Sequence, residues 1–265
     1  MALTITTHSF GPEPRQELDV YPARGNVAAA PVLVFIYGGS WKDGSRRLYR
    51  FLGKAFAAKG YCVVIPDYRL YPEGRYPSFT QDAAQALAWV RENISKFGGD
   101  ASQLNLMGHS AGAHTGALLC LDKSHLSDVD MSPLAIRTFT GIAGPYSFNP
   151  LESEVVRCVF EHLDDINQAR PIKHAHGKAP PMLLLDSTRD RTVGKHNSEH
   201  LRDAIREAGG IANHITYTRP GHTGIILSIA GPLRFLAPVF RDAHAFMKHR
   251  QDQAQKTPEL ESPGV

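Results

Sequence analysis

Residues 104–114 read LNLMGHSAGAH, an apolar run that leads through a Gly-x-Ser-x-Gly motif into small and apolar residues. Residues 104–107 are typical of a strand and residues 111–121 of a helix, so Ser110 lies at a strand-to-helix turn. A serine in such a turn takes a strained backbone conformation, and the glycines two positions to either side avoid clashes. The turn exposes the hydroxyl at the end of a sheet and points a helix N-terminus toward it. We therefore predict that Ser110 is a nucleophile.

Short apolar runs alternate with longer helical patterns along the rest of the chain. The runs typical of strands cover residues 32–37, 62–65, 104–107, 138–142, 182–185 and 215–218. The patterns typical of helices cover residues 48–59, 80–96, 111–121, 198–208 and 233–249. This alternation predicts an α/β fold with a mostly parallel central sheet and helices on both faces. Two more apolar runs, residues 3–10 and 17–21, flank a Gly-Pro-Glu-Pro turn and predict an antiparallel edge, for about eight strands in all.

The sequence predicts one domain over residues 1–248, because open α/β sheets often reach this length as a single unit. Residues 145–181 interrupt the alternation with prolines, histidines and acidic residues, so we expect a short cap-like excursion over one end of the sheet. Residues 249–265 are polar and contain two prolines, which predicts a flexible tail.

The composition of the chain excludes several classes of protein. It has 42% hydrophobic and 21% charged residues and a net charge of +3, with basic and acidic residues interspersed, so a nucleic-acid partner is not expected. The densest basic stretch, residues 46–50, is typical of a solvated helix face.

Three widely spaced cysteines imply no disulfide framework, and we expect no signal peptide and no membrane span from the apolar runs of the sequence. We expect a cytoplasmic protein that does not bind a membrane and is either a monomer or a homodimer.

Residues 32–41 read VLVFIYGGSW, an apolar strand that runs directly into a Gly-Gly turn. In the fold that carries this kind of nucleophile turn, the loop after the third strand supplies backbone N–H groups for the negative oxygen of a tetrahedral intermediate. We predict that the N–H groups of Gly39, Ser40 and Ala111 form this oxyanion hole. The alternative is that the two glycines only turn the chain.

The partners of such a serine follow it in the order acid and then histidine, each on a loop after a late strand. Asp186 and Asp190 both follow the apolar run 182–185, and we favour Asp190 because it lies farther out on the loop. His222 follows the last apolar run in a loop that reads RPGHTG. A histidine in a loop can reach the serine hydroxyl as a general base, oriented by the carboxylate.

The other histidines are predicted to be structural. His196, His200 and His214 lie on expected regular elements and are interpreted as surface residues. His109 and His114 flank Ser110, but their spacing does not place them on one helical face, so we expect no metal site.

These residues together resemble the esterase/lipase branch of the α/β-hydrolases, which includes hormone-sensitive-lipase-like carboxylesterases, acetyl-xylan-type esterases and kynurenine formamidases. The likeness covers residues 15–248. Its marks are YGGSW at 37–41, DYRLYPE at 67–73, Pro77 with Asp82, FGGD at 97–100, the serine motif at 108–112, Asp190, and Gly221 with His222.

The chain departs from this family at residues 37–41, the loop that is predicted to supply oxyanion donors and is called the oxyanion loop below. Where the family usually has His-Gly-Gly, this chain has Tyr37 before the two glycines, and Ser40 followed by Trp41 is closer to the formamidase-like members. The oxyanion donors are backbone groups, so Tyr37 should not abolish activity, but it leaves the hydrogen bonding of the loop open. Asp67, Arg69 and Glu73 in the second motif are expected to tie loops together through buried polar contacts.

The resemblance implies a serine hydrolase that cleaves carboxylic esters of short to medium acyl chains through an acyl-enzyme, with water as co-substrate and no cofactor. The chain lacks long cap insertions, which implies an open site whose apolar walls would include Trp41, Tyr146 and Phe148, unless these residues only pack in the core. Two alternatives stay open. One is an N-formyl amide hydrolase, and the other is a non-catalytic ligand-binding protein on the same fold.

Overall fold

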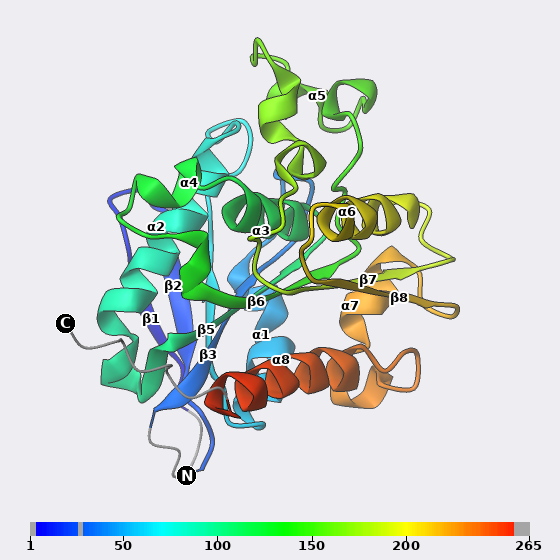
Figure 1. The fold of residues 1–265 in the computed structure, drawn as a ribbon. Helices are drawn as coiled ribbons and strands as arrows, with labels where there is room; N and C mark the ends of the chain where they lie inside the picture. The colour runs from blue at the N-terminus through cyan, green and yellow to red at the C-terminus, as the bar shows by residue number, and fades with distance from the viewer. Residues whose placement is uncertain (1–3, 26–28, 257–265) are drawn as a thin grey trace, which may run out of the picture.

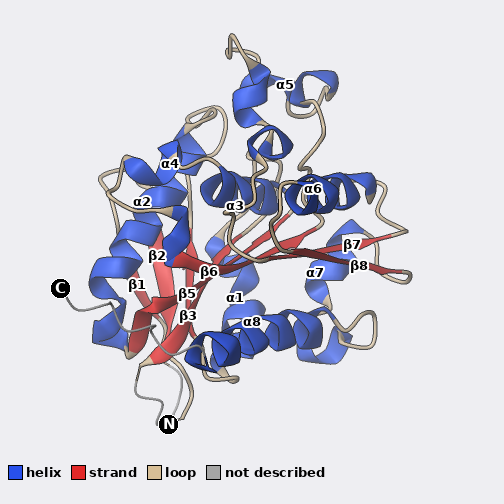
Figure 2. Cartoon of the chain, in the orientation of Figure 1, coloured by secondary structure: helices blue, strands red, loops and turns tan. Residues whose placement is uncertain are grey.

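A computed structural model of the protein describes residues 4–25 and 29–256 and contains a central sheet with helices on both faces (Figures 1 and 2). The strands are β1 (Thr6–Ser9), β2 (Glu17–Tyr21), β3 (Ala30–Ile36), β4 (Cys62–Pro66), β5 (Gly99–His109), β6 (Ile136–Ile142), β7 (Met182–Ser187) and β8 (Ala212–Tyr217). Their order across the sheet is β1-β2-β4-β3-β5-β6-β7-β8. β1 and β2 pair antiparallel at one edge, and every pair from β4 to β8 is parallel. The predicted eight-stranded, mostly parallel sheet is confirmed.

The helices cover both faces of the sheet, with α2, α3 and α6 on one side and α1 and α8 on the other (Figure 1). The α-helices are α1 (Arg50–Ala57), α2 (Ser78–Asn93), α3 (Ala111–Leu121), α4 (Ser124–Ser127), α5 (Arg157–Phe160), α6 (His196–Glu207), α7 (His222–Leu227) and α8 (Val239–Lys256). Short 3-10 helices are η1 (Arg46–Tyr49), η2 (Ile94–Phe97), η3 (Pro133–Ala135), η4 (Pro150–Glu152), η5 (Ile166–Ala169), η6 (Pro171–His174) and η7 (Gly231–Leu233). None of the helices in the described ranges has the length and apolar character that a membrane span requires.

The inner strands read as continuous apolar runs because helices cover them on both faces. All five residues of β4 are buried, as are all eleven residues of α3. The small residues of α3 let it lie close to the sheet: a Cβ added at Gly116 would lie 2.7 Å from the ring of Phe139 on β6. This close packing fixes the start of α3, where Ser110 lies.

The carboxyl ends of the parallel strands meet along one edge of the sheet. β3, β5 and β7 lead there to Ser40, Ser110 and Asp190, and β8 leads through a short loop to His222. His222 is the first residue of α7, so the prediction that it lies within the loop is wrong by one position. Open α/β sheets bind their ligands at this edge. The topology therefore gathers the predicted site residues, which are spread over more than 180 positions of sequence.

One predicted boundary differs from the structure. α8 continues to Lys256, eight residues past the predicted domain end at 248, because the added residues HRQDQAQK include no helix-breaking Gly or Pro. The rest of the predicted tail, residues 257–265, lies outside the described residues. The predicted excursion at 145–181 contains η4, α5, η5 and η6 between β6 and β7.

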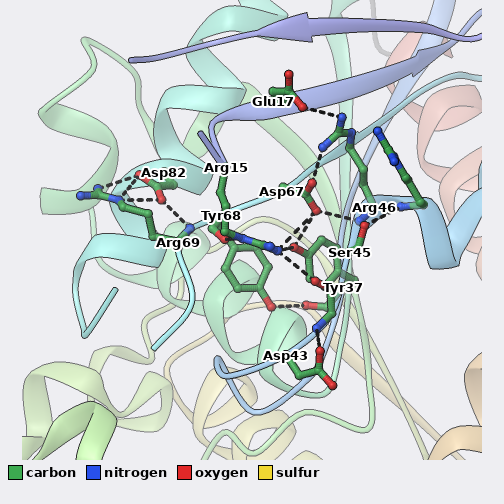
Figure 3. A network of polar contacts seen from close by, with 12 residues as sticks. Arg15, Glu17, Tyr37, Asp43, Ser45, Arg46, Asp67, Tyr68, Arg69 and Asp82 are labelled. Carbon is green, nitrogen blue, oxygen red and sulfur yellow. Dashed lines mark hydrogen bonds and ion pairs between the residues drawn. The ribbon is translucent and has the colours of Figure 1, made fainter. Parts of the chain in front are cut away.

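The basic stretch at 46–50 is only partly solvated. Arg47 and Arg50 are exposed as predicted, but Arg46 is buried and the predicted solvated face is wrong for this residue. Its guanidinium contacts the carboxylates of Glu17 and Asp67 (Figure 3). It also contacts the carboxylate of Asp19 at 2.9 Å. These acidic partners come from β2 and from the end of β4, which no local pattern around Arg46 could have indicated.

Replacing Arg46 with Met should strongly destabilise the protein, because Asp19 would stay buried without a counter-ion and Asp67 would keep only Arg15, at 3.7 Å. Loss of one partner of a buried ion pair costs about 3 to 5 kcal/mol. The free energy of unfolding in urea measures this loss. Arg47→Met removes the neighbouring exposed guanidinium and should change stability by less than about 0.5 kcal/mol. Equal stability of the two variants would show that the buried cluster contributes nothing.

Candidate active site

Ser110 occupies a sharp turn between β5 and α3, with φ 53° and ψ −123°. A residue other than glycine rarely adopts positive φ, so the surrounding packing must impose this conformation. The flanking glycines make the turn possible. A Cβ added at Gly108 would lie 2.4 Å from the carbonyl oxygen of Gly112, and one at Gly112 would lie 2.1 Å from that of Ile36. The N–H of Ser110 donates to the carbonyl of Ile142 at 2.8 Å, which ties the turn to β6.

Ser110, His222 and Asp190 form a continuous chain of hydrogen bonds. The His222 Nε2 atom lies 2.9 Å from the Ser110 hydroxyl oxygen, and the His222 Nδ1 atom lies 2.7 Å from Asp190 Oδ2. The Asp190 side chain is fully buried, whereas His222 keeps 15% exposure. In this geometry the imidazole can accept the serine proton on one nitrogen while the carboxylate holds the other N–H.

The Asp190 carboxylate is held in its charged form. Burial favours the neutral acid, but hydrogen bonds from His222 and from the backbone N–H groups of Val193 and Thr192 outweigh burial and lower the pKa of Asp190. Those two N–H groups bind Oδ1 at 2.9 and 2.8 Å. The other oxygen is thereby left for His222.

The rejected acid candidate, Asp186, has a different partner. Its Oδ2 atom lies 2.6 Å from Nε2 of His214, and both side chains are nearly inaccessible to solvent. The prediction that His214 is a surface residue is therefore wrong: it faces Leu184 across the β7–β8 pair, and Arg202 of α6 contacts its other ring nitrogen at 3.4 Å. His196 and His200 are exposed, as predicted.

The predicted oxyanion donors lie beside the serine. Ser40 and Ala111 line the same pocket as Ser110, and within the described chain no protein oxygen accepts a hydrogen bond from either N–H. Gly39 does not line this pocket, although its N–H also has no protein acceptor among the described residues. Its φ of 142° turns the loop, and a Cβ there would lie 2.0 Å from the carbonyl oxygen of Asp43.

A pocket of about 450 Å³ opens beside Ser110. Its walls are largely apolar and come from the oxyanion loop, the 145–181 segment and the start of α6. The lining residues are Ser40, Trp41, Ser110, Ala111, Pro145, Phe148, Ser153, Val155, Val156, Thr192, Val193, Gly194, His196 and Asn197.

Two of the three predicted wall residues line this pocket. Trp41 and Phe148 do so, but Tyr146 is fully buried and lies in the core, so this prediction is wrong. The hydroxyl of Tyr146 packs against the backbone of β6, where a Cβ added at Gly141 would lie 1.9 Å from it. Its neighbour Pro145 faces the pocket instead.

The sequence prediction missed the remaining apolar wall. Val155 and Val156 stand out only as an apolar pair in an otherwise polar stretch, and Val193 follows Asp190 by three positions. Asn197 shapes this wall indirectly, because its side-chain oxygen accepts hydrogen bonds from the N–H groups of Ser147 and Phe148. These contacts join segments about fifty residues apart, and no sequence pattern marks them.

The two histidines beside the serine are buried and have structural partners. His109 Nε2 lies 3.2 Å from the carbonyl oxygen of His222, and His114 Nε2 lies 2.7 Å from that of Ala169. Burial lowers the pKa of each to about 3, so both imidazoles are neutral at physiological pH. In the described ranges, no three His, Cys, Asp or Glu side chains are grouped so that they could hold a metal ion.

Comparisons with known proteins place these observations in a wider context. A protein-family model described as BD-FAE matches residues 18–205. A probable isoprenylcysteine alpha-carbonyl methylesterase of Oryza sativa subsp. japonica is 29% identical over 85% of this chain and 59% of its own length. Esterase LipC of Mycobacterium tuberculosis is 32% identical over 74% of this chain and 54% of its own length. The chain thus spans little more than half of these curated relatives.

A solved structure agrees with the fold. A truncated form of a carbohydrate esterase from gut microbiota superposes with a TM-score of 0.80 at 20% sequence identity, covering 93% of this chain and 96% of that one. At this level of identity the agreement concerns the architecture.

Acidification should remove part of the stability that Asp190 provides. Its pKa is lower in the folded than in the unfolded chain, so the stabilisation is complete above the unfolded value of about 4 and disappears as pH falls through the folded value. The melting temperatures of the wild type and Asp190→Asn should differ at pH 7 and converge toward pH 3. A difference that stays constant over this range would contradict the assigned hydrogen bonds.

Proposed function

This chain belongs to the BD-FAE family, and on that premise we propose that it is a serine hydrolase that cleaves carboxylic esters of short to medium acyl chains. It has the α/β-hydrolase fold. The observation that carries the proposal is the hydrogen-bonded chain from Ser110 through His222 to Asp190, beside a pocket that Ser40 and Ala111 also line. Relatives named as esterases support the same chemistry.

In the proposed reaction, His222 takes the proton of Ser110 as its oxygen attacks the ester carbonyl carbon. The negative charge that develops on the carbonyl oxygen is stabilised by the N–H groups of Ser40 and Ala111, with Gly39 as a further candidate donor. The intermediate collapses when His222 donates its proton to the departing alcohol, which leaves an acyl group on Ser110. Water, deprotonated by the same imidazole, then attacks the acyl carbon. His222 returns that proton to the Ser110 oxygen as the bond between this oxygen and the acyl carbon breaks, which releases the carboxylic acid and restores the free serine.

Asp190 has two roles in this scheme. Its hydrogen bond to Nδ1 orients the imidazole so that Nε2 faces the serine, and its charge stabilises the imidazolium that forms in each half of the reaction. Because two backbone N–H groups fix the other carboxylate oxygen, the orientation does not depend on a mobile side chain.

The pocket favours short or medium acyl chains. Its volume is about 450 Å³, and Trp41, Phe148, Val156 and Val193 give it apolar walls. We propose that residues 1–248 act as one catalytic domain and that residues 145–181 serve as its short cap. A small-molecule ester and water are the proposed reactants, and the mechanism needs no cofactor.

An N-formyl amide is the second candidate substrate. The observation that favours it is the Gly-Gly-Ser-Trp loop, in which Ser40 and Trp41 both line the pocket. A purely ligand-binding role fits less well, since the nucleophile, base, acid and candidate oxyanion donors are all present.

We also propose a reducing compartment, the cytoplasm, because Cys62, Cys120 and Cys158 are unpaired.

Hydrolysis assays with Ser110→Ala test the proposal. The wild type should hydrolyse p-nitrophenyl acetate and butyrate faster than the octanoate, and faster than N-formylkynurenine, and the variant should lose this activity. A preference for the formamide would select the second candidate. If the wild type turned over none of these compounds, or if Ser110→Ala kept full activity, the proposed function would be wrong.

The two aspartates after β7 provide a matched pair of variants. Asp190→Asn should lower kcat by about 10⁴-fold, because the amide no longer holds the imidazole in the required tautomer. Asp186→Asn alters an equally buried carboxylate that pairs with His214, so it should lower the melting temperature and leave kcat nearly unchanged. The opposite ranking of kcat would assign the acid to Asp186.

A further inference from the structure

The loop that carries the Ser40 N–H group has an unusual backbone. Gly39, Ser40 and Trp41 all have positive φ, at 142°, 53° and 56°. Two of these residues are not glycine, and such residues rarely adopt this region without external support. Contacts outside the loop must therefore hold the N–H group at its position beside Ser110.

Tyr37 lies at the base of this loop and contacts both of its ends. Its ring packs so closely on Gly44 that a Cβ there would lie 2.7 Å from the ring. It also stacks on Tyr68 with a centroid distance of 4.7 Å. The next residue, Gly38, lies directly on the nucleophile turn, since a Cβ there would lie 2.8 Å from Cβ of Ser110. Because Gly38 directly follows Tyr37, a shift of Tyr37 moves the residue that packs against Ser110.

The hydroxyl of Tyr37 is fixed by two charged side chains (Figure 3). It donates to Asp67 Oδ1 at 2.7 Å and accepts from Nη2 of Arg15 at 2.8 Å. The same Arg15 nitrogen donates to the carbonyl of Gly44 at 2.9 Å, at the far end of the loop. Asp67 is itself held by the backbone N–H and the guanidinium of Arg46.

The backbone of Tyr37 is held as firmly as its ring. Its carbonyl accepts a hydrogen bond from the hydroxyl of Tyr68 at 2.9 Å, and Tyr68 is completely buried. The Tyr37 phenol is buried as well, and burial together with the negative Asp67 raises its pKa, so it remains a neutral donor. The loop is thus attached at both ends to one buried polar cluster.

We propose that Tyr37 is a positioning residue for the oxyanion hole, holding the 38–44 loop through Asp67 and Arg15 so that the Ser40 N–H faces the reacting carbonyl. This inference rests on the proposed function. The N–H group binds the oxygen most strongly once it is negatively charged, so a misplaced loop weakens transition-state binding more than substrate binding. Loss of the Tyr37 hydroxyl should therefore lower kcat and leave KM nearly unchanged.

Kinetics of Tyr37→Phe test the proposal, because this substitution removes only the hydroxyl. We expect kcat for p-nitrophenyl acetate to fall by about 10- to 100-fold, since small displacements of catalytic groups have effects of this size, with KM within about two-fold of the wild type. Affinity for a trifluoromethyl ketone, whose adduct with Ser110 carries an oxyanion, should fall by the same factor as kcat/KM.

Tyr61→Phe is the matched control. Tyr61 is a buried tyrosine whose hydroxyl bonds His244 at 3.2 Å, away from the pocket. This variant should keep the wild-type kcat and inhibitor affinity even where its melting temperature falls as far as that of Tyr37→Phe. If Tyr37→Phe matched this control in kcat, or raised KM alone, Tyr37 would have only a structural role.

A second variant decides the question if Tyr37→Phe does not fold. Arg15 has a side chain that is 35% exposed, so Arg15→Gln should fold while losing the bonds to the Tyr37 hydroxyl and to Gly44. We expect a several-fold loss of kcat at unchanged KM, and an unchanged kcat would overturn the proposal. A wild type without Ser110-dependent turnover would instead overturn the proposed function, and this inference with it.

Discussion

Direct contact between two stretches of backbone determines the geometry of the site. The backbone at Gly38 packs closely against the carbonyl oxygen of His109 and against Ser110. The backbone at Gly112 packs closely against the carbonyl oxygens of Ile36 and Tyr37. Side chains at these glycines would separate β3 from β5 at the one edge where the two loops must meet. Because β3 and β5 are also neighbours in the sheet, the distance between the serine and the loop with the Ser40 N–H is set by main-chain packing.

The two halves of the site are supported in different ways. On one side, Asp190 and His222 are held by short hydrogen bonds within the loops after β7 and β8. On the other side, the oxyanion loop depends on a buried cluster of charges that draws on β2, β4 and η1. If Tyr37 positions this loop as we propose, the antiparallel edge of the sheet supports the site through Asp19 and Arg46.

Local patterns were sufficient to predict which candidate site residues the structure brings together, because each of them lies in a short motif at a strand end. Ser110, Asp190 and His222 are examples. The apolar runs of β3 and β4 likewise predicted two strands of the sheet. Contacts between distant segments could not be predicted. Tyr146 was predicted to line the pocket, but the chain bends after β6 so that Tyr146 is buried in the core and Pro145 lines the pocket. His214 was predicted to lie at the surface, but α6 covers it. Asp67 and Arg69 form the expected polar ties, whereas Glu73 is exposed.

Part of the pocket wall comes from a different segment of the chain than the hydrogen-bonded side chains beside it. Val155 and Val156 belong to a segment that contributes none of the hydrogen bonds joining Ser110, His222 and Asp190. Exchange of these two side chains therefore leaves those hydrogen bonds in place, whereas Ala169 of the same segment must stay in position, because its carbonyl oxygen lies 2.7 Å from His114 on α3. Under the proposed function, the acyl group that fits the pocket and the reactivity of Ser110 depend on different residues, so substitutions at positions 155 and 156 alter specificity while the three hydrogen-bonded side chains stay as they are.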